Sequence, residues 1–240
     1  MNSRSNKLAL GIAVALATPS IALAEGFYAT GHLGFSEQAS DSAPYGDNIA
    51  ADPDFPGKFD AGDSTVGSIG LGYQFSGQFR LEGRVSYRDS SFNDRQVGTG
   101  AREGEEYILN GAIESTTFTV EASYDFANDS SFTPYVKAGL GVSDNSYSAR
   151  LGGAGVAAFD PFDGVTDGYY DGYADGDSTE FSWNVGVGGD FEVSDSVSLY
   201  GEYRYVSFGD VSTGQDAFTD GFKIEDVSAN EFTLGIRIYF

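Results

Sequence analysis

The chain has 240 residues, no cysteine and one histidine, and its 36 acidic and 13 basic residues give a formal net charge of -23. These numbers exclude disulfide scaffolds, thiolate zinc sites, cysteine nucleophiles and multi-histidine metal sites. They also exclude nucleic acid as a partner, because phosphates require Lys and Arg. The 19 Phe and 15 Tyr argue against a disordered chain, since disordered chains are poor in aromatic residues.

Residues 1–24 have the features of a secretory signal peptide. Two basic residues supply a positive start, Leu8–Ala17 is an apolar run, and Ala22-Leu23-Ala24 is a small-x-small cleavage signal. A transmembrane helix is the alternative, but the run has ten residues whereas a span needs about 20. We therefore expect an exported chain whose residues 25–240 form one domain.

Apolar and polar residues then alternate in eight segments, and no segment shows a convincing helical period. Alternation is the period of a β-strand, whose successive side chains point to opposite faces. We expect each segment to cross a membrane as a tilted strand, which needs about 9–11 residues. The eight expected strands are Phe27–Ser36, Thr65–Phe75, Phe79–Arg88, Thr117–Phe126, Phe132–Ser143, Phe181–Phe191, Leu199–Tyr205 and Glu231–Phe240.

The connections between these strands alternate in length. Three are short (76–78, 127–131 and 193–196), and four are long (37–64, 89–113, 144–178 and 209–227). Outer-membrane barrels have short periplasmic turns and long extracellular loops, and an even strand count places both termini in the periplasm. The sequence therefore predicts an all-β fold, an eight-stranded antiparallel up-and-down transmembrane β-barrel. The long loops could also carry extensions of the strands, and the pair Asn110-Gly111 is a turn signal within the second of them.

Charged residues recur on the polar face of the expected strands. Eight strands enclose an interior that side chains just fill, so opposite charges there would form an ion-pair network that plugs the lumen. The alternative is a β-sandwich with one charged, solvated face, whose apolar faces would have to share one core. The expected lumen network comprises Arg80, Glu82, Arg84, Arg88, Glu121, Lys137, Glu202, Arg204, Glu231 and Arg237.

The last strand ends on an aromatic residue. We predict that Phe240 and Ile238 form the signal that the barrel-assembly machinery reads, with periplasmic chaperones as further partners, since an exposed amphipathic strand can pair with another barrel. Other aromatic residues near strand ends suit the interfacial girdles of a barrel. These are Phe27, Phe75, Phe79, Phe126, Phe132 and Phe191.

Four segments carry a resemblance to a known family: Gly26-Phe27-Tyr28, Tyr135 to Gly141, Tyr200 to Tyr205, and Leu234 to Phe240. With them the chain resembles the small eight-stranded outer-membrane barrels, namely the OmpA-like transmembrane domain and the opacity/porin-like β-barrel family. The resemblance implies a monomer in the outer membrane of a Gram-negative bacterium, in contact with lipid and lipopolysaccharide. No peptidoglycan-binding domain is expected after the last strand.

Catalysis and cofactor binding are not expected. A histidine-based hydrolase would need His32 beside a serine and a carboxylate, but His32 is expected to point into the lumen as a hydrogen-bonding residue. The acidic stretch 160–177 repeats Asp-Gly every four residues from 167 to 175 and could bind Ca2+ weakly, although it matches neither the EF-hand nor the β-helix calcium spacing. A hydrated acidic surface loop is the plainer interpretation.

Two functional hypotheses follow. The first is a structural or surface-interaction protein, whose lumen is plugged by charges and whose acidic extracellular loops meet the environment. The second is a narrow porin-like channel for small solutes or ions. Its space would come from inward-facing glycines at positions 34, 70, 72, 139, 141, 186, 188 and 235.

Overall fold

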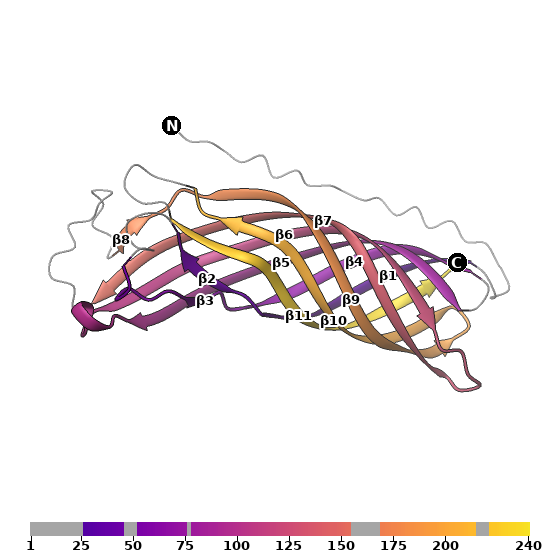
Figure 1. Cartoon of the computed structure of the whole chain (residues 1–240). Coiled ribbons are helices and arrows are strands. Elements are labelled where there is room, and N and C mark those ends of the chain that lie inside the picture. Colours follow the sequence, from indigo (N-terminus) through magenta and orange to yellow (C-terminus); the bar gives the residue numbers. More distant parts are fainter. Residues whose placement is uncertain (1–25, 46–51, 76–77, 155–168, 215–220) are drawn as a thin grey trace.

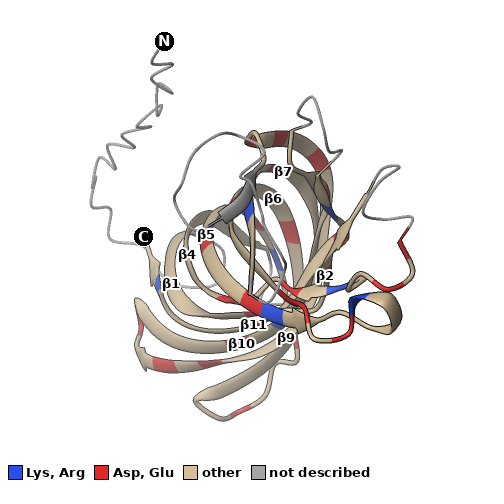
Figure 2. Cartoon of the chain, turned by 90° about the vertical axis from the view of Figure 1, so that its left-hand side faces the viewer, with Lys and Arg blue, Asp and Glu red and all other residues tan. Residues whose placement is uncertain are grey.

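A computed structural model describes residues 26–45, 52–75, 78–154, 169–214 and 221–240 (Figure 1). Eight long antiparallel strands pair in sequence order, and the last of them pairs with the first, so that the sheet closes into a ring (Figure 2). These strands are β1 (Gly26–Gln38), β4 (Asp63–Phe75), β5 (Phe79–Val97), β6 (Glu106–Asp125), β7 (Phe132–Ala154), β9 (Gly176–Ser194), β10 (Val197–Ser212) and β11 (Phe222–Tyr239). The predicted eight-stranded up-and-down barrel is confirmed.

The two ends of the barrel differ. The strand ends Phe75 and Phe79 and the short connections 126–131 and 195–196 lie with the C terminus at the end we call the short-turn end (Figure 1). The small elements lie at the opposite end, the long-loop end. They are β2 (Asp41–Pro44), β3 (Phe59–Asp60), β8 (Tyr169–Gly172) and the 3-10 turn η1 (Gly100–Arg102). Among the described residues no helix is long and apolar enough to span a membrane.

The strands extend further toward the long-loop end than the sequence predicted. β5 and β6 stay paired up to Val97 opposite Glu106, so the predicted loop 89–113 shrinks to residues 98–105. The predicted turn at Asn110-Gly111 is wrong, because both residues lie inside β6. A ladder of paired backbone groups outweighs a local turn preference here, and the added strand length buries apolar side chains such as Leu109.

The polarity of the two strand faces reverses along the barrel while the alternation keeps its phase. On β6, Tyr107, Leu109 and Ile113 point inward and are buried, whereas every second residue from Ser115 to Asp125 also points inward and is polar. The outward face reverses in the opposite sense, since the exposed apolar side chains gather on the half of each strand nearer the short-turn end. The outside is therefore apolar where the inside is polar, and polar where the inside is apolar.

The inward apolar residues close the long-loop end. They form one cluster, which we call the mouth cluster, and the segment between β2 and β4 contributes aromatic side chains to it. Phe55 packs edge-on against Tyr107 with ring centroids 4.5 Å apart, and Phe59 packs against Phe222 at 5.7 Å. The cluster comprises Phe55, Phe59, Ala61, Phe92, Tyr107, Leu109, Ile113, Tyr147, Ala149, Leu151, Tyr173, Val206, Phe208, Val211, Phe222, Ile224, Val227 and Ala229.

Aromatic side chains surround the short-turn end. Phe27, Tyr73 and Phe75 contact one another in a row, with ring centroids 4.9 and 4.8 Å apart. A second row at 5.0 and 5.3 Å joins Phe79, Tyr124 and Phe126. All six phenylalanines that the sequence assigned to a girdle are exposed. Exposed aromatic rings at one level are typical of a membrane interface.

Inward tyrosines fill the space that inward glycines leave. Each of three tyrosines lies across a glycine of the next strand, close enough that an added β-carbon at the glycine would fall within 2.5 Å of the ring. The close approach requires glycine because any side chain there would occupy the volume of the ring. The three pairs are Tyr28 with Gly72, Tyr135 with Gly188, and Tyr200 with Gly235.

We predict that Gly72→Val destabilises the barrel by about 1–3 kcal/mol, the usual cost of overpacking, because its side chain would meet the Tyr28 ring. Urea unfolding followed by the fluorescence of the single tryptophan, Trp183, measures the loss. Gly83→Val is the matched control, since an added carbon at Gly83 meets only the Leu71 carbonyl oxygen, at 4.0 Å. Equal unfolding midpoints for the two variants would contradict the packing argument.

Candidate functional site

Twelve charged side chains are buried among the described residues, and all of them point into the lumen. Six are basic and six are acidic, so the buried interior is balanced in charge. They are Arg80, Arg84, Arg88, Lys137, Arg204, Arg237, Glu82, Glu121, Asp125, Asp190, Glu202 and Glu231. Buried charges persist in proteins when they are paired and hydrogen-bonded, and the contacts below pair every one of them.

The layer nearest the short-turn end joins two arginines and two aspartates. Arg80 pairs with Asp125 and, at 3.0 Å, with Asp190, while Asp190 also pairs with Arg237. The guanidinium of Arg80 lies 4.7 Å from the ring centre of Tyr135. Such contacts with an aromatic face add electrostatic attraction to the ion pairs. Asp125 and Asp190 border an open vestibule at this end of the barrel, with a volume of about 260 Å3.

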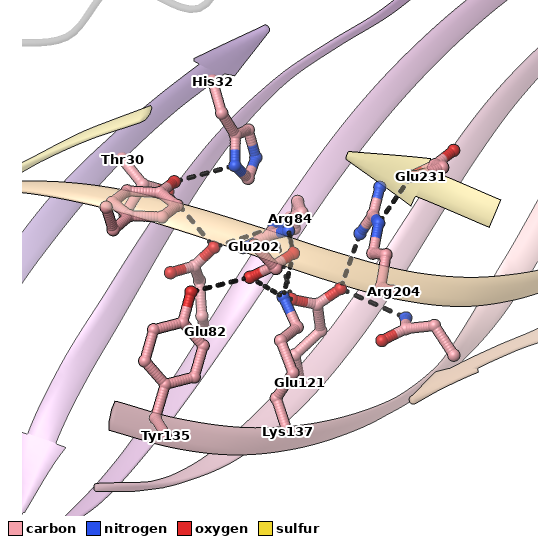
Figure 3. Close-up of polar contacts among 12 residues, drawn as sticks. Thr30, His32, Glu82, Arg84, Glu121, Tyr135, Lys137, Glu202, Arg204 and Glu231 are labelled. Atoms are coloured by element: carbon pink, nitrogen blue, oxygen red, sulfur yellow. Dashed lines mark hydrogen bonds and ion pairs between the residues drawn. The ribbon is translucent and has the colours of Figure 1, made fainter. Parts of the chain in front are cut away.

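Glu202 is the hub of the central layer (Figure 3). Its carboxylate accepts hydrogen bonds from Lys137 at 2.9 and 3.0 Å, from Arg84 at 3.1 Å and from the Tyr135 hydroxyl at 3.0 Å. Glu121 shares both cations, since its Oε2 lies 2.5 Å from Lys137 Nζ and 3.2 Å from Arg84 Nε. Two carboxylates and two cations from four different strands therefore meet at one level.

Arg204 connects this layer to the next one toward the long-loop end. Its Nη1 lies 3.2 Å from Glu121 and its Nε donates to Glu231 at 2.5 Å. Glu231 also pairs with Arg88, whose Nη1 donates to Thr117 at 3.0 Å. The ion pairs thus continue from strand to strand up to the mouth cluster, where the Arg88 guanidinium lies 4.5 Å from the ring centre of Phe208.

Neutral polar side chains complete the lumen. The Thr30 hydroxyl donates to Glu82 at 3.1 Å, and Glu82 in turn accepts from Arg84 Nε at 2.9 Å. His32 is 4% exposed, and its Nδ1 lies 2.7 Å from the Tyr200 hydroxyl. The single histidine therefore lies in the lumen as part of the hydrogen-bonded filling.

The structure places all ten charged residues of the expected lumen network inside the barrel and pairs each with an opposite charge. Sequence reasoning missed two members, Asp125 and Asp190, which complete the layer at the short-turn end. Both stood on the polar face of their strands. A requirement for balanced charge would have found them, because the ten expected residues comprise six cations and four anions.

Neighbouring atoms stand close over the inward glycines. At each of the eight glycines that could have made room for a channel, an added β-carbon would come within 2.8 Å of a neighbouring atom. Side chains or neighbouring backbone already occupy those positions. Glu82 and Thr30 stand over Gly70, for example, and Glu121 and Asn184 stand over Gly139.

Arg102 forms an ion pair with the segment between β2 and β4, which covers the long-loop end. Its Nε donates to Asp52 at 2.7 Å, and its Nη1 contacts Glu105 at 3.1 Å and the Tyr107 hydroxyl at 2.8 Å. The hydrogen bond from Arg102 lowers the pKa of Asp52 below its ordinary value. Hydrogen bonds from Tyr107 and Arg102 lower the pKa of Glu105. The carboxylates of this contact are therefore ionised at neutral pH.

Exposed carboxylates encircle the barrel just beyond its apolar outer band. Each of the eight barrel strands contributes one, and we call the ring that they form the acidic collar. Its members are Glu37, Asp63, Asp89, Glu114, Asp144, Asp177, Asp210 and Asp226. Within the described part of the chain, no group of three or more potential ligands is arranged to hold a metal ion. Residues 160–168, half of the stretch 160–177 where weak Ca2+ binding was predicted, lie outside the described residues.

Comparison with known proteins identifies the family. Residues 8–240 match the family described as outer membrane protein beta-barrel domain. The chain belongs to this family. The outer membrane protein PagN of Salmonella typhimurium strain LT2 is 27% identical to it over 188 residues, which cover 72% of each chain. The predicted resemblance is confirmed, and the chain is a β-barrel protein of a Gram-negative outer membrane.

Solved structures agree on the fold. The outer membrane protein OprG of Pseudomonas aeruginosa has a TM-score of 0.60 at 15% identity, over 90% of this chain and 96% of OprG. The outer membrane protease OmpT of Escherichia coli has a TM-score of 0.50 at 12% identity, over 90% of this chain and 97% of OmpT. At such identities the likeness concerns the fold alone.

We predict that Glu202→Gln lowers the free energy of unfolding by about 3–5 kcal/mol, the usual cost of breaking a buried ion pair, because Lys137 and Arg84 lose a shared partner. Adding Lys137→Met to this variant should restore part of the loss. Trp183 fluorescence during urea unfolding measures both variants.

The control for the Glu202 variant is Glu106→Gln, which breaks an ion pair with Arg95 in which the two side chains are 38% and 59% exposed. An exposed pair contributes no more than about 1 kcal/mol. A loss for Glu202→Gln as small as that of the control would show that the lumen network does not support the fold.

Proposed function

We propose that this protein is a non-enzymatic outer-membrane barrel with a structural or surface-interaction role, whose lumen is plugged. The observation that carries the proposal is the filling of the lumen between the vestibule at the short-turn end and the long-loop end. Twelve paired charges occupy the part inside the apolar band, and the mouth cluster occupies the long-loop end. A barrel closed in this way presents only its outer wall and its ends to other molecules.

The narrow channel is the weaker hypothesis. A channel would need the inward glycines to stay open, whereas neighbouring atoms stand over all eight of them. It would also need a hydrated path past the central layer. There Glu121 and Glu202 hold both Lys137 and Arg84 at ion-pair distance, so any permeating ion would have to break these contacts.

Access also argues against an enzyme built on His32. The histidine ring is buried in the lumen, and its Nδ1 is hydrogen-bonded to the Tyr200 hydroxyl. A substrate would need a route to the ring from the membrane or from one end of the barrel. The filled lumen offers none among the described residues, which favours a role in packing and hydrogen bonding.

The orientation that we propose places the long-loop end outside the cell and both termini in the periplasm. Strands reaching well beyond the apolar band, with acidic side chains on their outer face, suit a hydrated surface exposed to the medium. Residues 1–24 would direct export and be removed, and residues 25–240 would remain. The mature barrel would be a monomer among outer-membrane lipid and lipopolysaccharide.

We propose further that Phe240 and Ile238 form the signal for the barrel-assembly machinery, after delivery by periplasmic chaperones. Both side chains are about 45% exposed on the outer wall. The backbone amide of Phe240 donates to the Phe27 carbonyl at 3.0 Å, so the end of the chain lies at the seam between β11 and β1. Pairing at that seam joins the last strand to the first and closes the ring.

Planar-bilayer recordings test the plug. We expect the purified, folded protein to show no stable conductance steps, because the lumen contacts leave no continuous path for ions. A known porin inserted under the same conditions is the control for detection. A reproducible, charge-selective conductance would overturn the proposal and establish the channel.

Epitope labelling of intact cells tests the surface role. We expect an epitope inserted at Gly104, in the exposed 98–105 connection, to bind antibody on intact cells. The matched insertion at Asp129, in the short 126–131 turn, should bind antibody only after the outer membrane is permeabilised. The reverse pattern would place the long-loop end in the periplasm.

A further inference from the structure

An apolar groove runs over the outer wall of the barrel at β1, β4, β5 and β11. Its volume is about 760 Å3, and its walls are apolar side chains: the exposed Leu33, Ile69, Tyr87, Leu234 and Ile236, and the half-buried Val85. The groove exists because two outward-facing positions carry no side chain. A β-carbon added at Gly31 would meet nothing within 4 Å, and one at Gly67 would meet only Leu33 Cδ2, at 3.4 Å.

The groove differs from the inward glycine sites, where other side chains fill the space. Its two ridges include the most exposed apolar residues described, Leu33 and Leu234, each 75% exposed. In water a groove with such walls would be a costly surface. In the outer membrane the groove faces lipid. Its occupant is therefore an apolar chain narrow enough to fit the space where a glycine has no side chain.

Two members of the acidic collar stand at one end of this groove. Asp89 follows Tyr87 on the same face of β5, about 7 Å further along the strand. Glu114 lies directly opposite Asp89 on β6. The outer neighbours in this row are uncharged, because Thr65 lies opposite Asp89 on β4 and Ser146 lies opposite Glu114 on β7.

Like charges directly opposite each other on neighbouring strands repel. Nothing in the row from Thr65 to Ser146 neutralises Asp89 and Glu114. A cationic group between them would relieve the repulsion and would sit at the depth where lipid headgroups begin. A primary ammonium fits both carboxylates, since it can donate hydrogen bonds to each.

We propose that this groove binds a lipid whose headgroup carries a primary amine, with an acyl chain lying over Gly31 and Gly67 and the ammonium held by Asp89 and Glu114. The apolar part of the site comes from β1, β4, β5 and β11, and the charged part comes from β5 and β6. The proposal requires the barrel to lie in a lipid membrane and does not depend on whether the lumen is plugged.

Two other occupants fit less well. An anionic lipid would bring its charge against the two carboxylates and would be repelled without a bridging cation. A second copy of this chain, related by an axis along the membrane normal, would bring a second acidic collar to the same depth. Both alternatives bring negative charges close to Asp89 and Glu114, whereas a lipid amine brings a positive charge close to these carboxylates.

Native mass spectrometry of the folded chain in phosphatidylcholine nanodiscs tests the proposal. We titrate in phosphatidylethanolamine or phosphatidylglycerol with identical acyl chains, in the presence and absence of Mg2+. The wild type should bind phosphatidylethanolamine preferentially and without Mg2+. The double variant Asp89→Asn/Glu114→Gln should bind it roughly fivefold more weakly, the loss expected for a solvent-exposed charge contact.

A second pair of variants tests the groove itself. Gly31→Leu/Gly67→Leu should fill it and weaken binding of phosphatidylethanolamine, and both positions have room for a side chain, so the barrel should fold. Asp177→Asn, a collar residue on β9, and Gly83→Val, an outward glycine beyond the groove, are the matched controls and should bind as the wild type does. The shift of electrophoretic mobility on heating verifies that each variant is folded.

Three results would overturn the proposal. Equal binding of the two lipids by the wild type would remove the role of the amine. Preferential binding of phosphatidylglycerol that depends on Mg2+ would establish a cation bridge instead. A dimer that Gly31→Leu/Gly67→Leu dissociates would make a second copy of the chain the occupant of the groove.

Discussion

The absence of water in the membrane interior is the constraint on which this structure depends. Every backbone amide and carbonyl must find a partner within the protein, so the sheet must close, and the pairing of β1 with β11 closes it. Closure with eight strands fixes an interior that side chains just fill. The other features of the barrel fill that interior, while the medium that the outer wall contacts changes from lipid to water along the barrel.

The reversal of polarity along each strand is that solution. Where the outer wall meets lipid, the inside holds polar side chains, and their charges balance because an unpaired charge there would have neither water nor a partner. Where the outer wall meets water, the inside is an ordinary apolar core. Tyr107 and Glu121 both point inward from β6. Tyr107 lies in the apolar core where the outer wall meets water, and Glu121 lies among the charges where the outer wall meets lipid. The acidic collar marks the level at which the environment outside the barrel changes.

Much of this was readable from the sequence, because alternation reports local geometry directly. The eight strands, their faces and the inward position of residues such as Arg84 and Glu202 follow from a period of two. Strand ends were not readable. Residues 89–113 looked like a loop because their apolar side chains face inward and their polar side chains face outward, as in a soluble sheet. This alternation is weaker than the alternation in the membrane-facing parts of the same strands. Pairing between β5 and β6 extends the strands through Asn110-Gly111 in spite of its turn preference.

The sequence by itself determined the barrel, its membrane-facing residues and the pool of charges available to the lumen, since each depends only on the side of the strand on which a residue falls. The tertiary structure alone decided which charges meet. Arg204 joins Glu121 to Glu231 across the lumen, and strand tilt and register set that choice. It also decided that inward glycines are filled by tyrosines while outward Gly31 and Gly67 leave a groove, because only neighbouring strands determine whether the space beside a glycine is occupied.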